Sequence, residues 1–120
     1  MRLRNLVAVP ALVSLLSLTS RADVLKLVID DTIQAATAER IDRALNRAAT
    51  EKDDAVLIEL TTPGGVMGAM QEIIQKILAS PVPVIIYVTP SGSRAASAGF
   101  FILESADVAA MAPGTNTGAG

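Results

Sequence analysis

Short apolar segments recur along this chain, beginning near residues 24, 55, 83 and 108, and helical patterns separate them. The segments are rich in Val, Ile and Leu, which is typical of buried strands. One helical pattern covers residues 37–50, a second is marked by apolar residues from Met70 to Leu78, and a third covers residues 97–105. This alternation requires parallel strands joined by right-handed crossovers. We therefore expect an α/β fold whose functional groups lie in the loops at the carboxyl ends of the strands.

The first 22 residues have a different pattern, that of a secretory signal peptide. Arg2 and Arg4 precede an apolar run over residues 6–18, and small residues stand at Ser20 and Ala22. The apolar run is shorter than the roughly 20 residues that a spanning helix needs. We expect a signal peptide at 1–22, with an uncleaved anchor or an ordinary apolar N-terminus as alternatives. The protein is then exported, to the periplasmic or extracytoplasmic side, or associated with a membrane.

The composition excludes several kinds of active site. The chain has no Cys and no His, which rules out disulfides, Cys-based zinc sites, His-ligated metals and the Ser-His-Asp triad. A nucleophile must be Ser, Thr, Lys or a carboxylate. The formal net charge is −2 and aromatic residues make up 2% of the chain, so nothing indicates nucleic-acid binding. We expect no metal and no cofactor.

The first loop of interest follows the second strand and reads Thr-Pro-Gly-Gly-Val over residues 62–66. Its two glycines allow positive φ and leave backbone N–H groups uncovered. Such groups can stabilise a developing oxyanion. The alternative is an ordinary turn between a strand and a helix.

The second loop of interest follows the third strand and covers residues 91–99. Ser97 has an alanine on each side and is followed by Gly99, so a substrate carbonyl could approach it closely. The alternative is that Ser97 is a helix N-cap. The loop is not a G-x-S-x-G nucleophile elbow, because position 95 is alanine. Adjacent parallel strands would bring the two loops together.

Four segments of the chain carry a specific resemblance: residues 59–65, 77–84, 88–99 and 111–116. In combination they resemble the NfeD-like membrane-bound serine proteases, the stomatin operon partner proteins, of the ClpP/crotonase superfamily. Signal peptide peptidase A is similar in the serine loop. The resemblance runs from about residue 24 to the C-terminus. It implies repeated β-α units with a parallel sheet that is incomplete at the C-terminus, and residues 23–120 as the N-terminal part of a ClpP-like protease domain.

The resemblance also implies roles for particular residues. Ser97 would be the nucleophile, and Gly64, Gly65 and the N–H of Ala98 would form the oxyanion hole. The family uses a Ser-Lys dyad whose lysine lies some tens of residues beyond the serine.

The lysines of this chain all precede the serine. Lys52 stands in a charged loop, Lys76 on a polar helix face and Lys26 within the first strand. None matches the family's position, so no general base is assigned.

The function that the resemblance implies is that of a serine endopeptidase, a hydrolase that cleaves hydrophobic segments of membrane-associated proteins. A stomatin-like membrane protein would be the partner, the membrane would be reached through segments outside this chain, and the protein would form homo-oligomers. Two alternatives remain. The chain could be a non-catalytic remnant that binds a membrane partner, which the absence of a lysine after Ser97 favours. It could also be a crotonase-type acyl-CoA enzyme, against which the signal peptide and the serine loop count.

Overall fold

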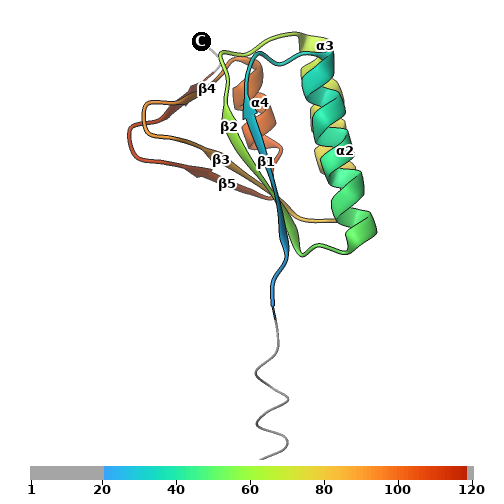
Figure 1. Ribbon diagram of the computed structural model, residues 1–120. Helices are drawn as coiled ribbons and strands as arrows, with labels where there is room; N and C mark the ends of the chain where they lie inside the picture. Colours follow the sequence, from blue (N-terminus) through green and yellow to red (C-terminus); the bar gives the residue numbers. More distant parts are fainter. Residues whose placement is uncertain (1–20, 119–120) are drawn as a thin grey trace, which may run out of the picture.

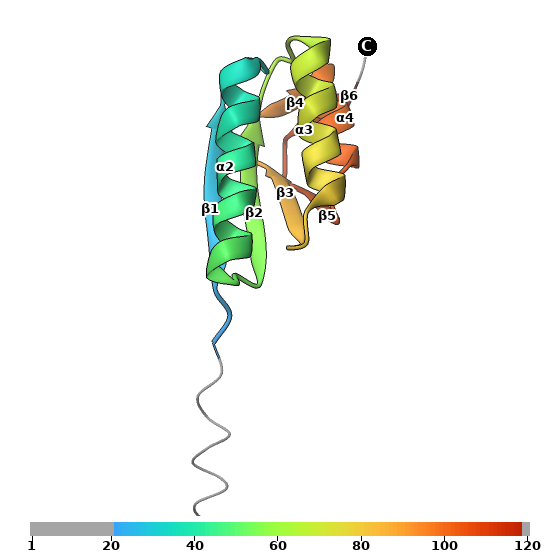
Figure 2. The same ribbon diagram turned by 90° about the vertical axis from the view of Figure 1, so that its right-hand side faces the viewer.

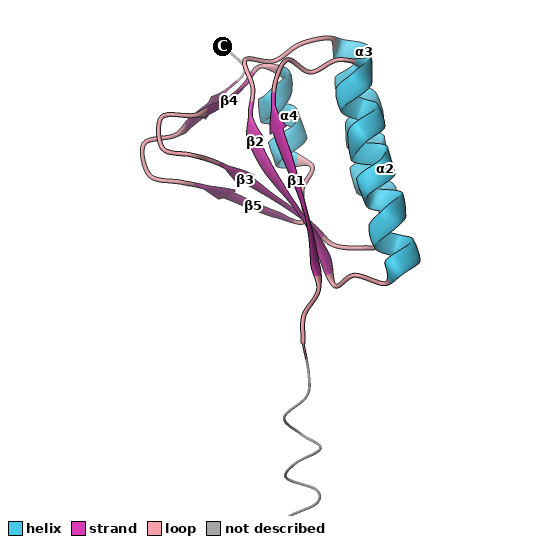
Figure 3. Ribbon diagram, viewed as in Figure 1, coloured by secondary structure: helices cyan, strands magenta, loops and turns pink. Residues whose placement is uncertain are grey.

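The computed structural model describes residues 21–118 as an alternation of strands and helices (Figure 1 and Figure 3). The predicted signal peptide, apart from its last two residues, lies outside the described part. In chain order the elements are β1 (Val24–Asp30), α2 (Ala35–Glu51), β2 (Ala55–Thr61), α3 (Met67–Ala79), β3 (Val84–Val88), β4 (Arg94–Ala96), α4 (Ala98–Glu104), β5 (Val108–Met111) and β6 (Asn116–Gly118).

The main sheet contains four strands in the order β1-β2-β3-β5, and every neighbouring pair is parallel. The predicted α/β fold with a parallel sheet is therefore confirmed. Helices α2 and α3 begin two or more residues before the predicted patterns. At the start of α2, Thr37 Oγ1 accepts the Gln34 N–H at 3.3 Å and donates to the Thr32 carbonyl at 3.0 Å, which orders the first turn.

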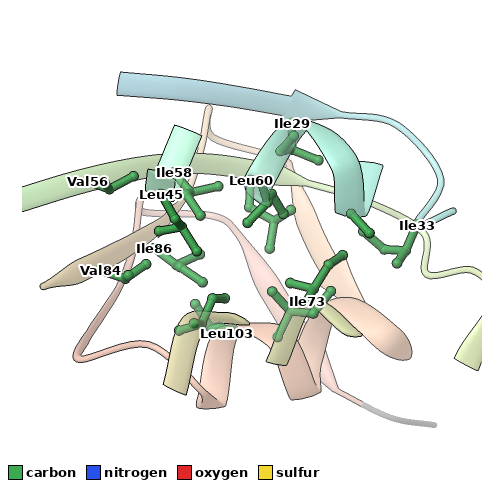
Figure 4. Packing of buried hydrophobic residues seen from close by; sticks show 14 of the residues in the cluster. Ile29, Ile33, Leu45, Val56, Ile58, Leu60, Ile73, Val84, Ile86 and Leu103 are labelled. Atoms are coloured by element: carbon green, nitrogen blue, oxygen red, sulfur yellow. The ribbon is translucent and has the colours of Figure 1, made fainter. Parts of the chain in front are cut away.

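The core lies between the main sheet and the helices. Side chains of α3 and α4 face the strands, as Ile73 and Leu103 do toward Ile86 and Leu60 in Figure 4. The view in Figure 2 shows α2 and α3 running side by side across the sheet. Alternate residues of β2 and β3 are fully buried, as expected for strands with one face against helices. The fully buried side chains of this cluster are mostly Ile and Val, which pack densely without aromatic residues.

A second, two-stranded sheet pairs β4 with β6 in parallel, and the sequence did not indicate it. Strand β4 thus lies within the loop expected over residues 91–99, and β6 follows the last of the four expected strands. Figure 1 shows the two connections, β3 to β4 and β5 to β6, projecting together from the main sheet before they turn back. The two connections are joined where the Gly92 N–H donates to the Gly114 carbonyl at 3.1 Å.

Within residues 21–118, no helix is both long enough and apolar enough to cross a membrane.

Candidate active site

The two glycine- and serine-bearing loops meet at the carboxyl end of β2. A methyl group built on Gly64 would lie 2.9 Å from the Ser97 Cβ and 3.4 Å from the Ala98 nitrogen. Thr62, the first residue after β2, pairs with β4: its N–H donates to the Arg94 carbonyl at 2.8 Å, and its carbonyl accepts an N–H from β4 at 3.1 Å. The expectation that parallel topology brings these loops side by side is confirmed.

Ser97 occupies a strained turn between β4 and α4. Its φ is 51° and its ψ is −114°, a combination that non-glycine residues rarely adopt and that costs about 1–3 kcal/mol. Its N–H donates to the Gly118 carbonyl at 2.8 Å, and its carbonyl accepts the Phe100 N–H at 3.0 Å. The backbone on both sides of the serine is thus fixed by hydrogen bonds, which allows the unusual conformation to persist.

The side chain of Ser97 is exposed and forms no helix-capping hydrogen bond. An N-cap serine has extended φ and ψ and bonds to the first turn of its helix. The N-cap interpretation of Ser97 therefore does not account for this turn. A sharp strand–turn–helix that exposes the serine oxygen is instead the geometry of a nucleophile elbow, here without the G-x-S-x-G sequence.

The Gly64-Gly65 loop is held against the segment that leaves β1. The Ile33 N–H donates to the Gly64 carbonyl and the Val66 N–H donates to the Ile33 carbonyl, both at 2.8 Å. A methyl group on Gly65 would lie 2.0 Å from the Ile33 carbonyl oxygen, so only glycine fits there. Gly64 has φ of 111°, which also favours glycine.

The backbone N–H groups of the loops differ in what they bind. The Gly64 N–H donates to Thr62 Oγ1 at 3.2 Å. Within residues 21–118, the N–H groups of Gly65 and Ala98 have no protein acceptor. These two groups are therefore available to an oxygen of a bound molecule.

A hollow of about 210 Å³ lies beside the serine. Its lining consists of Gly65, Met67, Met70, Ser97, Ala98 and Phe101. Both residues with available N–H groups line this hollow together with the serine, and the rest of its wall is apolar. Ligand pockets for whole small molecules measure about 300–1,000 Å³, so this hollow is closer to the size of one side chain. A larger hollow of about 330 Å³, between β1 and α2, contains no serine or threonine.

The lysines lie away from the serine hollow, none of whose lining residues is ionisable. Lys26 forms an ion pair with Glu59 at 3.1 Å, and Lys76 forms one with Asp42 at 3.4 Å. Lys52 caps the C-terminus of α2 in a left-handed conformation. In the described part of the chain, then, no lysine stands beside Ser97. In the same part, no group of three or more acidic, His or Cys side chains could hold a metal ion.

Sequence reasoning missed Thr62 and the apolar wall of Met67, Met70 and Phe101. The helical spacing placed Met70 on the apolar face of α3, where it is half-buried, but did not show that this face reaches the serine. The alternation of β2 could have distinguished Thr62 from Thr61, because Thr62 follows Val56, Ile58 and Leu60 on the buried face.

A model of the family described as NfeD1b, N-terminal domain, matches residues 23–120. The chain is 46% identical over 91 residues to the membrane-bound protease PH1510 of Pyrococcus horikoshii, covering 76% of this chain and 21% of that protein. It is 32% identical over 91 residues to the membrane protein NfeD1b of Bacillus subtilis, covering 76% of this chain and 20% of that protein. The chain thus spans about a fifth of the length of these relatives.

Solved structures of proteases also match this chain. The chain matches a serine-to-alanine mutant of the 1510-N membrane-bound stomatin-specific protease with a TM-score of 0.81 and 41% identity, over 83% of this chain and 48% of that one. A lysine-to-alanine mutant of that protease, in complex with a substrate peptide, matches with a TM-score of 0.80 and 42% identity, over 83% and 46%. ClpP1 from Listeria monocytogenes matches with a TM-score of 0.71 at 23% identity, over 78% and 55%, which shows a common fold.

Proposed function

The chain belongs to the family of NfeD1b N-terminal domains, and we propose that it carries the nucleophile of a serine endopeptidase of the Ser-Lys type. The observation that carries the proposal is the exposed, strained serine beside two N–H donors that have no acceptor within residues 21–118. An acyl-transfer site requires a nucleophile and oxyanion donors within reach of one carbonyl. The similarity to a stomatin-specific protease supports the same reaction.

In the proposed reaction, Ser97 Oγ attacks the peptide carbonyl and forms a C–O bond. A neutral lysine takes the serine proton and later gives it to the leaving amine as the C–N bond breaks. Water then hydrolyses the acyl-enzyme. Gly65 and Ala98 donate to the oxyanion, since their N–H groups are available. Gly64, the third residue expected in the oxyanion hole, supports the loop while its own N–H stays bonded to Thr62.

The lysine of the proposed pair comes from outside the described residues. Lys26 and Lys76 are engaged in ion pairs and Lys52 ends a helix, so none of them is proposed as the base. The family resemblance gives the lysine a position beyond the serine. That the related protease was studied as a serine and as a lysine mutant is consistent with such a pair.

The proposed substrate is an apolar peptide segment of a stomatin-like membrane protein. The hollow beside Ser97 is walled by Met67, Met70 and Phe101, which would accept an apolar side chain next to the scissile bond. The relative's specificity for stomatin supports this substrate class. We further propose that residues 1–22 are a signal peptide that directs export of the protein and that the protease domain begins at residue 23. We also propose that the protein associates with the membrane and forms a homo-oligomer.

The test replaces Ser97 with alanine in the natural gene product, which includes any sequence that the gene encodes after Gly120. Ser91→Ala is the matched control, because Ser91 is an exposed serine of the same connection between β3 and α4. We expect Ser97→Ala to lower the cleavage of an apolar peptide by more than about 10⁴-fold and Ser91→Ala to leave it unchanged. Labelling by a fluorophosphonate should follow the same pattern.

Undiminished cleavage by Ser97→Ala would overturn the proposal. If the natural protein binds a stomatin-like partner but neither cleaves peptides nor reacts with the fluorophosphonate, the chain is the non-catalytic partner-binding protein that the sequence left as an alternative.

A further inference from the structure

Thr62 is a buried polar residue, and the proposed reaction does not explain why it is buried. Its exposed fraction is 1%, and within residues 21–118 the only other buried polar residue is Thr37, which organises the start of α2. A buried hydroxyl needs hydrogen-bond partners to offset its lost hydration. The partners of Thr62 therefore indicate what the residue holds in place.

The hydroxyl of Thr62 binds the glycine loop. Thr62 Oγ1 accepts the Gly64 N–H at 3.2 Å and lies 3.4 Å from the Gly64 carbonyl oxygen, to which it can donate. This is a turn closed by a threonine side chain two residues earlier in the chain. It fixes the orientation of the peptide group that enters Gly64, and with it the peptide group that enters Gly65.

The remainder of Thr62 contacts the serine loop. Its main-chain N–H and carbonyl pair with β4, the strand that ends at Ser97. Its methyl carbon Cγ2 would be only 2.5 Å from a methyl group on Gly99, two residues after the serine. One side chain thus touches both halves of the site, through its hydroxyl on one side and its methyl group on the other.

We propose that Thr62 is a positioning residue, whose hydroxyl keeps the Gly64 N–H out of the site so that the Gly65 N–H faces the oxyanion. The inference rests on the proposed function. Without the hydroxyl, the buried Gly64 N–H has no acceptor within the turn, and the loop can rotate to find one. A displacement of about 1 Å in such a donor can cost on the order of 100-fold in rate.

The test compares Thr62→Val with Thr62→Ser in the natural gene product, with Ser97→Ala as the reference for loss of the reaction. Valine keeps the shape of threonine and removes the hydroxyl, whereas serine keeps the hydroxyl and removes the methyl group. We expect Thr62→Val to lower kcat by roughly 10- to 100-fold with KM within about twofold, because the oxyanion contact belongs to the transition state. Thr62→Ser should restore kcat to within about fivefold of the parent, since its hydroxyl can bind Gly64 again.

Amide hydrogen exchange gives a second readout that does not need turnover. The Gly64 amide should lose protection in Thr62→Val and retain it in Thr62→Ser, measured at low temperature so that both variants stay folded. An unchanged kcat in Thr62→Val, equal losses in the two variants, or a protected Gly64 amide in Thr62→Val would overturn the inference. If Ser97→Ala still cleaves the peptide, the proposed function itself fails, whichever result Thr62 gives.

Discussion

Gly65 lies where the glycine loop crosses the segment that leaves β1, and replacing it with alanine should push these two segments apart. The added methyl carbon would be 2.0 Å from the Ile33 carbonyl oxygen and 2.7 Å from two further backbone atoms of Ile33. All three obstructing atoms are backbone, so no side-chain rotation can relieve the contact. The two segments must separate by more than about 1 Å to reach an ordinary van der Waals distance.

This separation has an estimable cost in stability. Hydrogen bonds of 2.8 Å stand on both sides of the contact, from Ile33 to Gly64 and from Val66 to Ile33, and both would stretch beyond bonding distance. Two lost bonds at about 1 kcal/mol each, with some overpacking strain, give about 2–4 kcal/mol. For a domain of this size, that lowers Tm by at least roughly 8 °C.

Gly68→Ala is the matched control. Gly68 stands in the first turn of α3, and a methyl group there would meet no atom within 4 Å. Alanine in a helix is favoured over glycine by about 0.5–1 kcal/mol, so Tm should rise by roughly 2–8 °C. Melting curves by far-ultraviolet circular dichroism measure both changes. All samples contain the same concentration of trimethylamine N-oxide, an osmolyte that stabilises the folded state, so that the destabilised variant is folded at the start of its melting curve. A Gly65→Ala variant that melts within about 2 °C of the parent, or one that shifts in the same direction as Gly68→Ala, would refute the argument.

Two further predictions concern the fold. Ile73→Ala should lower the free energy of unfolding, measured in urea, by about 2–5 kcal/mol, because Ile73 is 0% exposed. Leu78→Ala on the same helix should change it by less than about 0.5 kcal/mol, because Leu78 is 71% exposed. Equal losses in the two variants would contradict this packing. A double-mutant cycle on Lys26 and Glu59 should give a coupling of about 0.2–1 kcal/mol that falls in 1 M salt, since the lysine is largely exposed. A coupling above about 2 kcal/mol would mean that the pair is far less solvated than its exposure indicates.

The main sheet and its helices could be predicted because their signals are local. Each long strand is a run of branched apolar residues, and each long helix has an apolar stripe at helical spacing. From parallel strands alone it followed that the glycine and serine loops meet, so the pairing of the candidate site was also within reach of the sequence.

The second sheet could not be predicted, because β4 and β6 contain three residues each and no alternating pattern. These strands exist through their pairing with each other, which is a long-range contact. The same pairing sets the backbone of Ser97, so a serine that reads as a helix cap has a different conformation in the fold. Thr61 and Thr62 are chemically identical neighbours, and Thr62 is the buried one because it continues the alternation of Val56, Ile58 and Leu60 on the buried face of β2.

The hydrogen bond from the Ser97 N–H to the Gly118 carbonyl has a consequence for how the protein is made. The acceptor strand is synthesised about 20 residues after the serine. At translation rates of about 5–20 residues per second, roughly one to four seconds pass before the ribosome has added it. Throughout that interval β4 lacks its partner strand β6. The strained backbone of Ser97 can be held by this hydrogen bond only once the later strand arrives, so the order of synthesis makes this turn one of the last parts of residues 21–118 to take its final conformation.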